Sequence, residues 1–353
     1  MSTNEMKSTN YKEISNKGYS QIAAKILPKS VFLKIKHIKS RFNYFILNIY
    51  DSKSFIKSMN ANNSAKAKYN TLINTHILEK GLSHEKIRFQ FGRQVLIRLS
   101  NNLTDLNEYK LNESEEFSYA LSTLHEYYIL HKENGINTDF LKDIFGNYIF
   151  SMIANNNDSF NNIGGTLVLK KSDKENNRFL GFDKLAKNRF TIRNFQDSEV
   201  NFEFVEEAIN IAKKSPSACN RQSSKIIAIK NQSLIKEILE VQGGFRGYQI
   251  PKVLLISLTD NNAYSSYTDR YMGYVDGGLF TMSLIYGLEF VGLGACLLNA
   301  SFDLKKEKKI KKIASISENE KFIALIAVGN IPDETKIAVS YRLDEDNILR
   351  VIE

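Results

Sequence analysis

The pattern of hydrophobic residues changes near residue 163, and this change constrains the fold more than any other feature of the chain. Before it, apolar residues recur at helical spacing, as in Phe117, Leu121, Leu124 and Tyr128, and no strand-like alternation stands out. After it, helical segments alternate with short apolar runs that are typical of buried strands. The chain is therefore expected to be of the α+β class, with an all-helical N-terminal half.

The second half of the chain predicts a sheet flanked by helices. The expected strands are 166–169, 225–230, 253–258, 295–298 and 322–328, and the expected helices are 202–214 and 276–291. The stretch 277–300 is apolar except for Glu289 and is long enough to span a membrane. Because Gly287, Gly292 and Gly294 punctuate it, we interpret it as a buried helix followed by a strand.

The composition along the chain predicts four parts. Residues 1–16 are polar and lack the apolar core of a signal peptide, so we expect them to be disordered. Residues 17–160 should form a helical domain, 161–180 a connector, and 181–353 the domain that contains the sheet. Within the helical domain, Pro28 is expected to start a helix, and Gly81 is expected to cap the C-terminus of another.

The formal net charge of +9 is concentrated in the N-terminal half, where residues 1–170 carry +7. Asp51 is the only acid within residues 14–57. This basic segment could contact an anionic membrane surface or nucleic acid, or it could be a solvated helix face. Its apolar residues between 35 and 49 need a buried partner, so we favour packing against the second domain or a dimer mate. Peripheral membrane contact stays an alternative, and no nucleic-acid partner is expected.

The cysteines and histidines predict no metal site. Cys219 and Cys296 provide no disulfide framework and no metal-binding spacing, which is typical of the reducing cytoplasm. The five histidines are scattered through the N-terminal half without zinc-site spacing. A small buried cysteine is more common than a redox thiol, so neither cysteine is assigned chemistry. We expect a cytoplasmic protein.

Two nearby stretches carry the chemistry that the sequence predicts, and the first is 187–195. Arg189 and Arg193 lie four residues apart in a segment that is expected to open near a helix, so both can face one ligand. Arginine forks suit phosphate groups, and the Thr191 hydroxyl between them can donate a further hydrogen bond. Considered alone, this pattern is more often a pair of solvated surface charges.

The second stretch, 215–222, follows one helix later. Pro216 and Ser217 should end the preceding helix and form a tight turn. The Asn220 amide both donates and accepts hydrogen bonds, which matches the edge of an isoalloxazine ring. An ordinary helix-to-strand loop would have a similar composition, so the two stretches together carry more weight than either one.

Together, the two stretches resemble the nitroreductase family, whose domain opens with Arg-x-Ser/Thr-x-Arg/Lys-x-Phe and continues with Ser-Pro-Ser-x-x-Asn-x-Gln. Two later elements resemble the same family. Asp276-Gly277-Gly278 opens a long apolar helix with a Gly292-Leu293-Gly294 ending, and Ser340-Tyr341-Arg342-Leu343 follows the last strand. The resemblance covers residues 181–353 and implies an FMN-binding sheet domain there.

The resemblance also implies roles for individual residues. The phosphate and ribityl side of FMN should be held by Arg189, Thr191, Arg193 and Arg342, with Phe190 in the same motif. The ring should be lined by Pro216, Ser217, Ala218 and Asn220. A backbone amide near flavin N5 should come from the segment Leu298, Asn299 and Ala300. The family implies NAD(P)H as electron donor and a homodimer with FMN at its interface. No side chain is assigned as catalytic, because hydride exchange takes place on the flavin.

Three features leave the substrate open. Ser223-Ser224 and Asn299-Ala300 stand where many family members have Pro-Trp and Glu-Gly. Residues 76–83 resemble a His-x-Ile-Glu-Lys-Gly-Leu element of long family members from bacterial surface-polysaccharide gene sets. His76 and Lys80 lie one helical turn apart and could bind an anion, although a surface ion pair is favoured. The alternatives are a substrate-specific flavin dehydrogenase or oxidase, and a scaffold or binding module in polysaccharide assembly.

Overall fold

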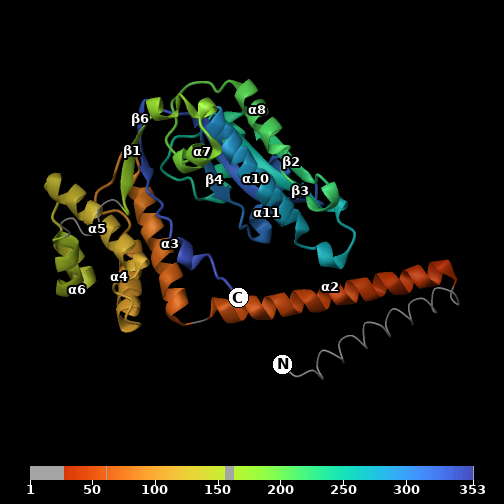
Figure 1. Cartoon of the computed structure of the whole chain (residues 1–353), viewed down its shortest axis with the longest axis horizontal. Helices are drawn as coiled ribbons and strands as arrows, with labels where there is room; N and C mark the ends of the chain where they lie inside the picture. The colour runs from red at the N-terminus through yellow and green to blue at the C-terminus, as the bar shows by residue number, and fades with distance from the viewer. Residues whose placement is uncertain (1–27, 61, 156–162, 353) are drawn as a thin grey trace. The chain divides into compact units, whose positions relative to one another are not determined.

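The computed structural model describes residues 28–60, 62–155 and 163–352 (Figure 1). The prediction of disorder for 1–16 lies outside these residues. By their contacts, the described residues form two compact units: 28–60 with Tyr264–Tyr271, and 62–263 with 272–352. The domain limits expected from the sequence, at 17–160 and 181–353, concern independent folding and stay a prediction.

The first unit consists of a long helix and one short turn. Helix α2 (Lys29–Met59) begins directly after Pro28, as expected from the conformation that proline favours at a helix start. The 3₁₀ turn η5 (Tyr267–Asp269) adjoins Arg270, whose Nη2 donates to Oδ2 of Asp51 at 2.7 Å. This hydrogen bond from Arg270 lowers the pKa of Asp51. The only acid of the basic segment is therefore paired.

The second unit starts with four helices that share one hydrophobic core. They are α3 (Ser64–Leu82), α4 (Arg93–Glu108), α5 (Glu115–Glu133) and α6 (Asp139–Ala154). Phe117, Leu121 and Leu124 of the predicted stripe are fully buried, and Tyr128 packs against them. Among the described residues before 163 there is no strand, so the all-helical expectation is confirmed for them.

The helix that was expected to end at Gly81 continues through it to Leu82, with Ser83 as its cap. Gly81 is needed for packing instead, because a Cβ there would lie 2.0 Å from a ring carbon of Phe91. The expectation that Gly81 is a C-cap is therefore wrong. A nearby aromatic ring, which the local sequence does not reveal, selects this glycine.

The rest of the second unit contains an antiparallel sheet with strand order β2-β3-β5-β4. These strands are β2 (Ser224–Ile229), β3 (Val253–Asp260), β4 (Leu293–Asn299) and β5 (Glu320–Asn330). A separate pair joins β1 (Thr166–Lys170) to β6 (Glu334–Ala338). The α+β class and all five predicted strands are confirmed, whereas β6 was not predicted.

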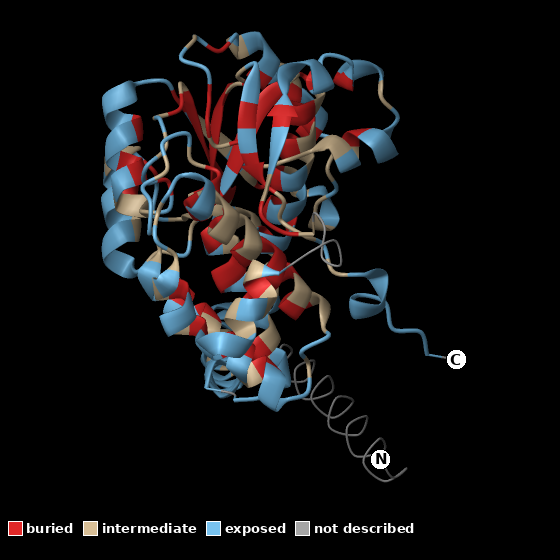
Figure 2. Cartoon of the chain, turned by 90° about the vertical axis from the view of Figure 1, so that its left-hand side faces the viewer, coloured by how far each residue is buried: buried red, intermediate tan, exposed pale blue. Residues whose placement is uncertain are grey.

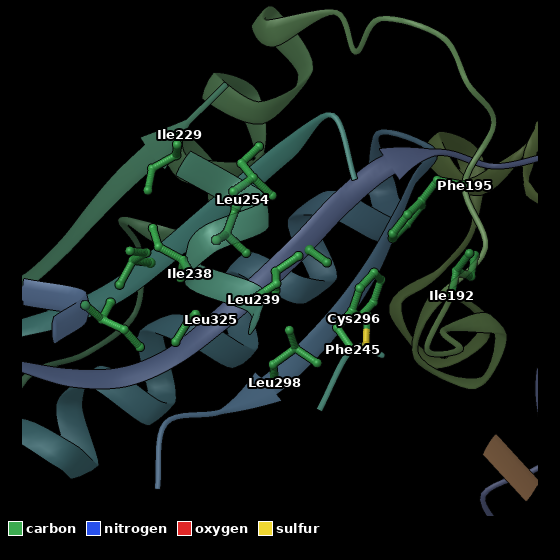
Figure 3. Packing of buried hydrophobic residues seen from close by; sticks show 14 of the residues in the cluster. Ile192, Phe195, Ile229, Ile238, Leu239, Phe245, Leu254, Cys296, Leu298 and Leu325 are labelled. Atoms are coloured by element: carbon green, nitrogen blue, oxygen red, sulfur yellow. The ribbon is translucent and has the colours of Figure 1, made fainter. Parts of the chain in front are cut away.

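Helices cover both faces of the main sheet. Leu254, Ile256 and Leu258 of β3 point to the face covered by α9 (Gln232–Gln242) and α11 (Leu304–Ile313), and Figure 3 shows part of this core. Val253 and Leu255 point to the face covered by α8 (Phe202–Ala212) and α10 (Met272–Phe290). Figure 2 shows that the strands are largely buried as a result. A strand with both faces covered reads as a continuous apolar run.

The stretch 277–300 forms the predicted helix and strand, α10 followed by β4. Gly287 lets α10 approach α8, because a Cβ at this position would lie 2.7 Å from the carbonyl oxygen of Ala208. Gly292, between helix and strand, has a φ of +79°, which glycine adopts readily. Within the described part of the chain, no helix is both long and apolar enough to cross a membrane.

Candidate functional site

A cavity of about 660 Å³ lies where six segments of the second unit meet. The segment after α7 (Phe182–Asn188) supplies Arg189, Thr191 and Arg193. Helices α3, α5 and α10, strand β4 and the segment 340–343 supply the remaining lining residues: Leu72, His76, Tyr119, Met282, Ile285, Tyr286, Ala295, Leu297, Ser340, Tyr341, Arg342 and Leu343. Four predicted phosphate-side residues, from segments 150 residues apart, thus line one cavity.

Residues 189–193 reach the cavity in an extended conformation. Helix α7 ends at Asn188, and Arg189 already has extended backbone angles. Alternate side chains of an extended segment point to opposite sides. Arg189, Thr191 and Arg193 therefore face the cavity, while Phe190 and Ile192 pack in the core. The two arginines face one cavity, as expected, but through the two-residue period of an extended chain.

The cavity has a strongly positive wall. Burial and the nearby charge of Arg342 lower the pKa of Arg189, although Glu289 opposes this effect. Among the described residues, no carboxylate forms an ion pair with Arg189, Arg193 or Arg342. The Nη1 atom of Arg193 is buried and has no hydrogen-bond partner in the described part of the chain. Such a group is costly to bury alone, so the wall is suited to an anion.

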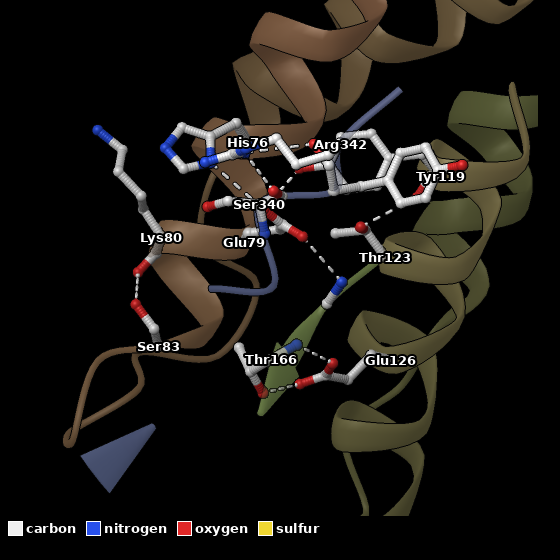
Figure 4. A network of polar contacts seen from close by, with 12 residues as sticks. His76, Glu79, Lys80, Ser83, Tyr119, Thr123, Glu126, Thr166, Ser340 and Arg342 are labelled. Atoms are coloured by element: carbon white, nitrogen blue, oxygen red, sulfur yellow. Dashed lines mark hydrogen bonds and ion pairs between the residues drawn. The ribbon is translucent and has the colours of Figure 1, made fainter. Parts of the chain in front are cut away.

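A buried carboxylate connects the helical region to the cavity (Figure 4). The Oε2 atom of Glu79, in α3, accepts a hydrogen bond from the hydroxyl of Tyr119 at 2.6 Å and lies 3.3 Å from Nδ1 of His76. The backbone N–H groups of Gly165 and Ser340 donate to the same carboxylate at 3.0 and 3.3 Å. Burial, followed by the neighbouring Glu79 charge, raises the pKa of Tyr119.

A buried ion pair, formed by Lys174 and Glu289, contacts the segment that leads to Arg189. The Nζ of Lys174 lies 2.5 Å from Oε1 of Glu289, and both side chains are only 4% exposed. Lys174 also donates to the backbone oxygen of Asn188, the residue before Arg189. Asn177 donates to the same carboxylate at 2.9 Å. Burial raises the pKa of Glu289, and the charge of Lys174 opposes the rise.

The predicted ring-lining loop lies elsewhere in the same chain. Pro216 and Ser217 line a hollow of about 130 Å³, beside Asp276. The backbone N–H of Ala218 lies 3.1 Å from both carboxylate oxygens of Asp276, which holds the loop to α10. Asn220 has a φ of +53°. None of these loop residues lines the larger cavity, so one chain does not bring the two predicted groups together.

The third predicted group lies at the end of β4. Leu298 points into the core, whereas its neighbour Leu297 lines the cavity. The backbone oxygen of Asn299 accepts a hydrogen bond from Gln242 at 3.2 Å, and Ala300 packs against the core. The strand alternation that carries Ala295 and Leu297 to the cavity turns the Leu298 side chain away from it.

Several residues that line the cavity were not predicted as site residues. Leu72, His76 and Tyr119 come from the helical region. Of these three residues, only His76 had a signal in the sequence, the 76–83 segment, because a helix with mixed polar residues resembles a solvated face. Cys296 is buried, which raises the pKa of its thiol, and Cys219 is exposed. The described residues contain no cluster of potential metal ligands.

The comparisons with known proteins agree with the motifs. Residues 186–245, which contain both Arg189–Arg193 and the Pro216–Asn220 loop, match the model of the nitroreductase family. The resemblance that the motifs indicate is thus confirmed for this segment. No curated protein matches the sequence.

Solved structures with a similar fold include three from bacteria. A putative NADH oxidase from Clostridium acetobutylicum is 22% identical, with a TM-score of 0.41, over 47% of this chain and 97% of that one. An FMN-dependent nitroreductase from Clostridium difficile is 17% identical, with a TM-score of 0.41, over 47% and 96%. A nitroreductase family protein from Streptococcus pneumoniae is 22% identical, with a TM-score of 0.42, over 49% and 100%.

Proposed function

We propose that the protein is an FMN-dependent oxidoreductase of the nitroreductase type. The observation that carries this proposal is the convergence of Arg189, Arg193 and Arg342 on one cavity, in which a buried guanidinium nitrogen has no partner among the described residues. Bound FMN would accept a hydride at N5 from NAD(P)H and pass it to an acceptor. The family match over 186–245 supports the same cofactor.

The cavity residues fit the phosphate end of FMN. Arg189, Arg193 and Arg342 can each offer paired N–H donors to phosphate oxygens, and Thr191 can add a hydroxyl. Pockets for small molecules commonly measure about 300–1,000 Å³, and this cavity lies within that range. The protein's part would be to bind and orient the cofactor, and the positive wall would also favour the negative charge that reduction brings.

A homodimer would explain why the ring-lining loop lies apart from the arginines. If a second copy supplied its Pro216–Asn220 loop, both predicted groups could contact one FMN, together with the backbone at Leu298–Ala300. Light scattering on the purified protein should therefore give the mass of a dimer. Coexpression of Arg193→Ala and Asn220→Ala chains should restore one intact site in each mixed dimer, whereas either variant alone should bind FMN weakly.

The central test is flavin binding. The purified protein should show flavin absorbance, and FMN titration should weaken by at least tenfold in Arg193→Ala, because each lost charged hydrogen bond costs about 1.5–3 kcal/mol. Arg350→Ala is the matched control, since this exposed arginine lines none of the cavities described above. Absence of flavin from the protein, with no effect of Arg189→Ala or Arg193→Ala on FMN titration, would refute the proposal.

The electron donor and acceptor are separable experimentally. In anaerobic rapid mixing, bleaching of the flavin by NADH or NADPH alone would support the reductase. Bleaching by a candidate sugar substrate alone would favour a substrate-specific dehydrogenase or oxidase. We also propose a cytoplasmic location, for which the two cysteines without a disulfide framework are the support, and a setting in surface-polysaccharide assembly, for which the resemblance of residues 76–83 is the support.

A membrane-surface role is a second candidate, and α2 is the observation that favours it. Within the described residues, no side chain of this 31-residue helix is buried. Ile38, Phe42, Phe45, Tyr50 and Phe55 are all at least 60% exposed on an otherwise basic helix. Basic helices with exposed apolar side chains can bind anionic lipid surfaces. The role would be supported if the protein sedimented with phosphatidylserine vesicles but not with phosphatidylcholine vesicles, and if Phe42→Ser/Phe45→Ser abolished this. Equal amounts of protein in the pellet with and without vesicles would oppose it.

A further inference from the structure

We propose that His76 of α3 is a further anion ligand of the cavity, positioned by the buried carboxylate of Glu79. The helical region would then take part in binding the cofactor phosphate, which extends the site beyond the 186–245 segment. This inference rests on the proposed function for the identity of the anion. The geometry of His76 and Glu79 is independent of the proposed function.

The imidazole of His76 has one nitrogen engaged and one available. Its Nδ1 lies 3.3 Å from Oε2 of Glu79, so an Nδ1–H group can donate to the carboxylate. Its Nε2 has no hydrogen-bond partner among the described residues, and the side chain is 37% exposed where it lines the cavity. When both ring nitrogens carry a proton, both are donors, so the ring can bridge the Glu79 carboxylate and an anion in the cavity.

Glu79 is held too firmly to follow a mobile side chain. It is fully buried, and three donors other than His76 surround its carboxylate: the Tyr119 hydroxyl and the backbone N–H groups of Gly165 and Ser340. Two of these donors are backbone groups in different segments, so the carboxylate cannot turn without losing them. The position of His76 is therefore set by the frame of the protein.

The same carboxylate is linked to Arg342 through Ser340. Ser340, which donates its N–H to Glu79, also accepts a hydrogen bond from the guanidinium of Arg342 through its backbone oxygen. Figure 4 shows His76, Ser340 and Arg342 around the carboxylate of Glu79. One buried anion thus aligns a histidine and an arginine at the same wall.

The charge around His76 selects the kind of ligand. The cavity lining contains three arginines and one histidine but, among the described residues, no carboxylate. Glu79 lies behind this wall and already has its donors. Tyr119, Tyr286 and Tyr341 also line the cavity, and a phenol hydroxyl can donate a hydrogen bond. A group with two negative charges and several acceptor oxygens, such as a phosphate monoester, matches this arrangement.

The decisive experiment compares FMN with riboflavin, which has the same ring system and lacks the phosphate. Both ligands are titrated into the full-length apoprotein, with flavin fluorescence as readout. His76→Gln should weaken FMN binding about tenfold or more and leave riboflavin binding unchanged, because a charged hydrogen bond to phosphate is lost. His76→Lys should recover part of the FMN affinity. His37→Gln, an exposed histidine in α2, is the control.

Glu79→Gln tests the positioning role. The amide keeps the size of the side chain but loses the charge, and its NH₂ group must face one of the present donors. FMN affinity should fall as in His76→Gln, with no further fall in the double variant. Equal losses for FMN and riboflavin in His76→Gln, or no loss for either, would overturn the inference. Far-ultraviolet circular dichroism on each variant confirms that the chain is folded.

A separate arm distinguishes this inference from the proposed function. If the wild-type protein binds neither FMN nor riboflavin, the proposed function fails. The anion site is then tested with inorganic phosphate, followed through the ¹⁵N resonances of His76, which the His76→Gln spectrum assigns. A saturable shift at Nε2, absent in Arg342→Ala, supports the site. An unchanged Nε2 resonance overturns it.

Discussion

Replacing Lys174 by Met tests whether the candidate site depends on the buried ion pair behind it. The Nζ of Lys174 and Oε1 of Glu289 are 2.5 Å apart, and both side chains are 4% exposed. Methionine resembles lysine in length but carries no charge. Lys174→Met therefore leaves the Glu289 carboxylate buried without its cation, and it removes the donor to the backbone oxygen of Asn188.

The expected loss of stability is large. Removing one partner of a buried pair costs about 3–5 kcal/mol, because the remaining charge keeps its desolvation penalty and loses its compensation. At about 2–4 °C per kcal/mol for a domain of this size, Tm should fall by about 6–20 °C. Lys174→Met/Glu289→Leu should recover most of the loss, since a hydrophobic replacement of both charges is about neutral. Asn177 then still donates to the backbone oxygen of residue 289.

The variant should also change how stability depends on pH. Burial raises the pKa of Glu289, and Lys174 limits that rise. Without Lys174 the pKa of the folded state should rise further above that of the unfolded state. Such a carboxyl takes up a proton on folding, so the unfolding free energy increases as pH falls. As pH falls towards the ordinary carboxyl value of 4.5, this increase should be steeper in Lys174→Met than in the wild-type protein.

Urea unfolding followed by circular dichroism at several pH values measures these effects, and FMN titration in parallel measures the effect on the cavity. The Arg189 backbone follows directly after Asn188, so FMN affinity should fall in the single variant. A loss below about 1 kcal/mol would refute the reasoning, because it would lie in the range of an exposed pair. A double variant as unstable as Lys174→Met would refute it as well.

Three further perturbations test other parts of the structure. Gly81→Ala should destabilise the protein by about 1–3 kcal/mol, because the new Cβ would lie 2.0 Å from a ring carbon of Phe91. Gly278→Ala, whose Cβ would meet nothing within 4 Å, should be neutral or stabilising by up to about 1 kcal/mol. Thermal melts of both variants test this difference. Asp276→Asn should change the free energy of FMN binding more than the free energy of unfolding, because the carboxylate accepts from the Ala218 N–H of the loop. An unchanged FMN affinity would contradict this. Burial lowers the pKa of His131 below its ordinary 6.5, so the folded state binds fewer protons than the unfolded state. The urea midpoint should therefore fall as pH drops below about 6.5. A midpoint that does not change with pH in this range would argue against the buried neutral histidine.

The strands of the main sheet were predictable because burial on both faces leaves a local trace. Strand β3 (Val253–Asp260) begins with four consecutive apolar residues, and every residue of it except Asp260 is buried. Strand β6 (Glu334–Ala338) leaves no such trace, because charged and polar residues make up its first half. It forms through pairing with β1, about 170 residues earlier in the chain. Lys-rich α11 (Leu304–Ile313) was missed for a similar reason, since few of its side chains are buried.

The residues of the candidate site were likewise predictable only in part from the sequence. Arg189, Thr191 and Arg193 were predicted to act together, and they line one cavity because a short extended segment carries its own alternation. The Pro216–Asn220 loop was predicted for the same ligand, yet in one chain it lines a different hollow. Its contribution to the proposed site depends on a second copy, which no local pattern encodes. His76 and Tyr119 reach the cavity only because α3 and α5 pack beside the segment 340–343.

By itself, the sequence determined most of the helical and strand segments, the motifs that resemble those of the nitroreductase family, and the common face of Arg189, Thr191 and Arg193, because these depend on periodicity and on residues within a few positions of each other. The tertiary structure alone decided that Glu79 is a buried anion and that His76 faces the cavity. Along the chain, Glu79 is one polar residue on a helix of mixed composition. Its burial and its donors come from Tyr119, Gly165 and Ser340, which lie 40 to 261 residues away. Desolvation depends on such distant neighbours, and so does the chemistry of the group.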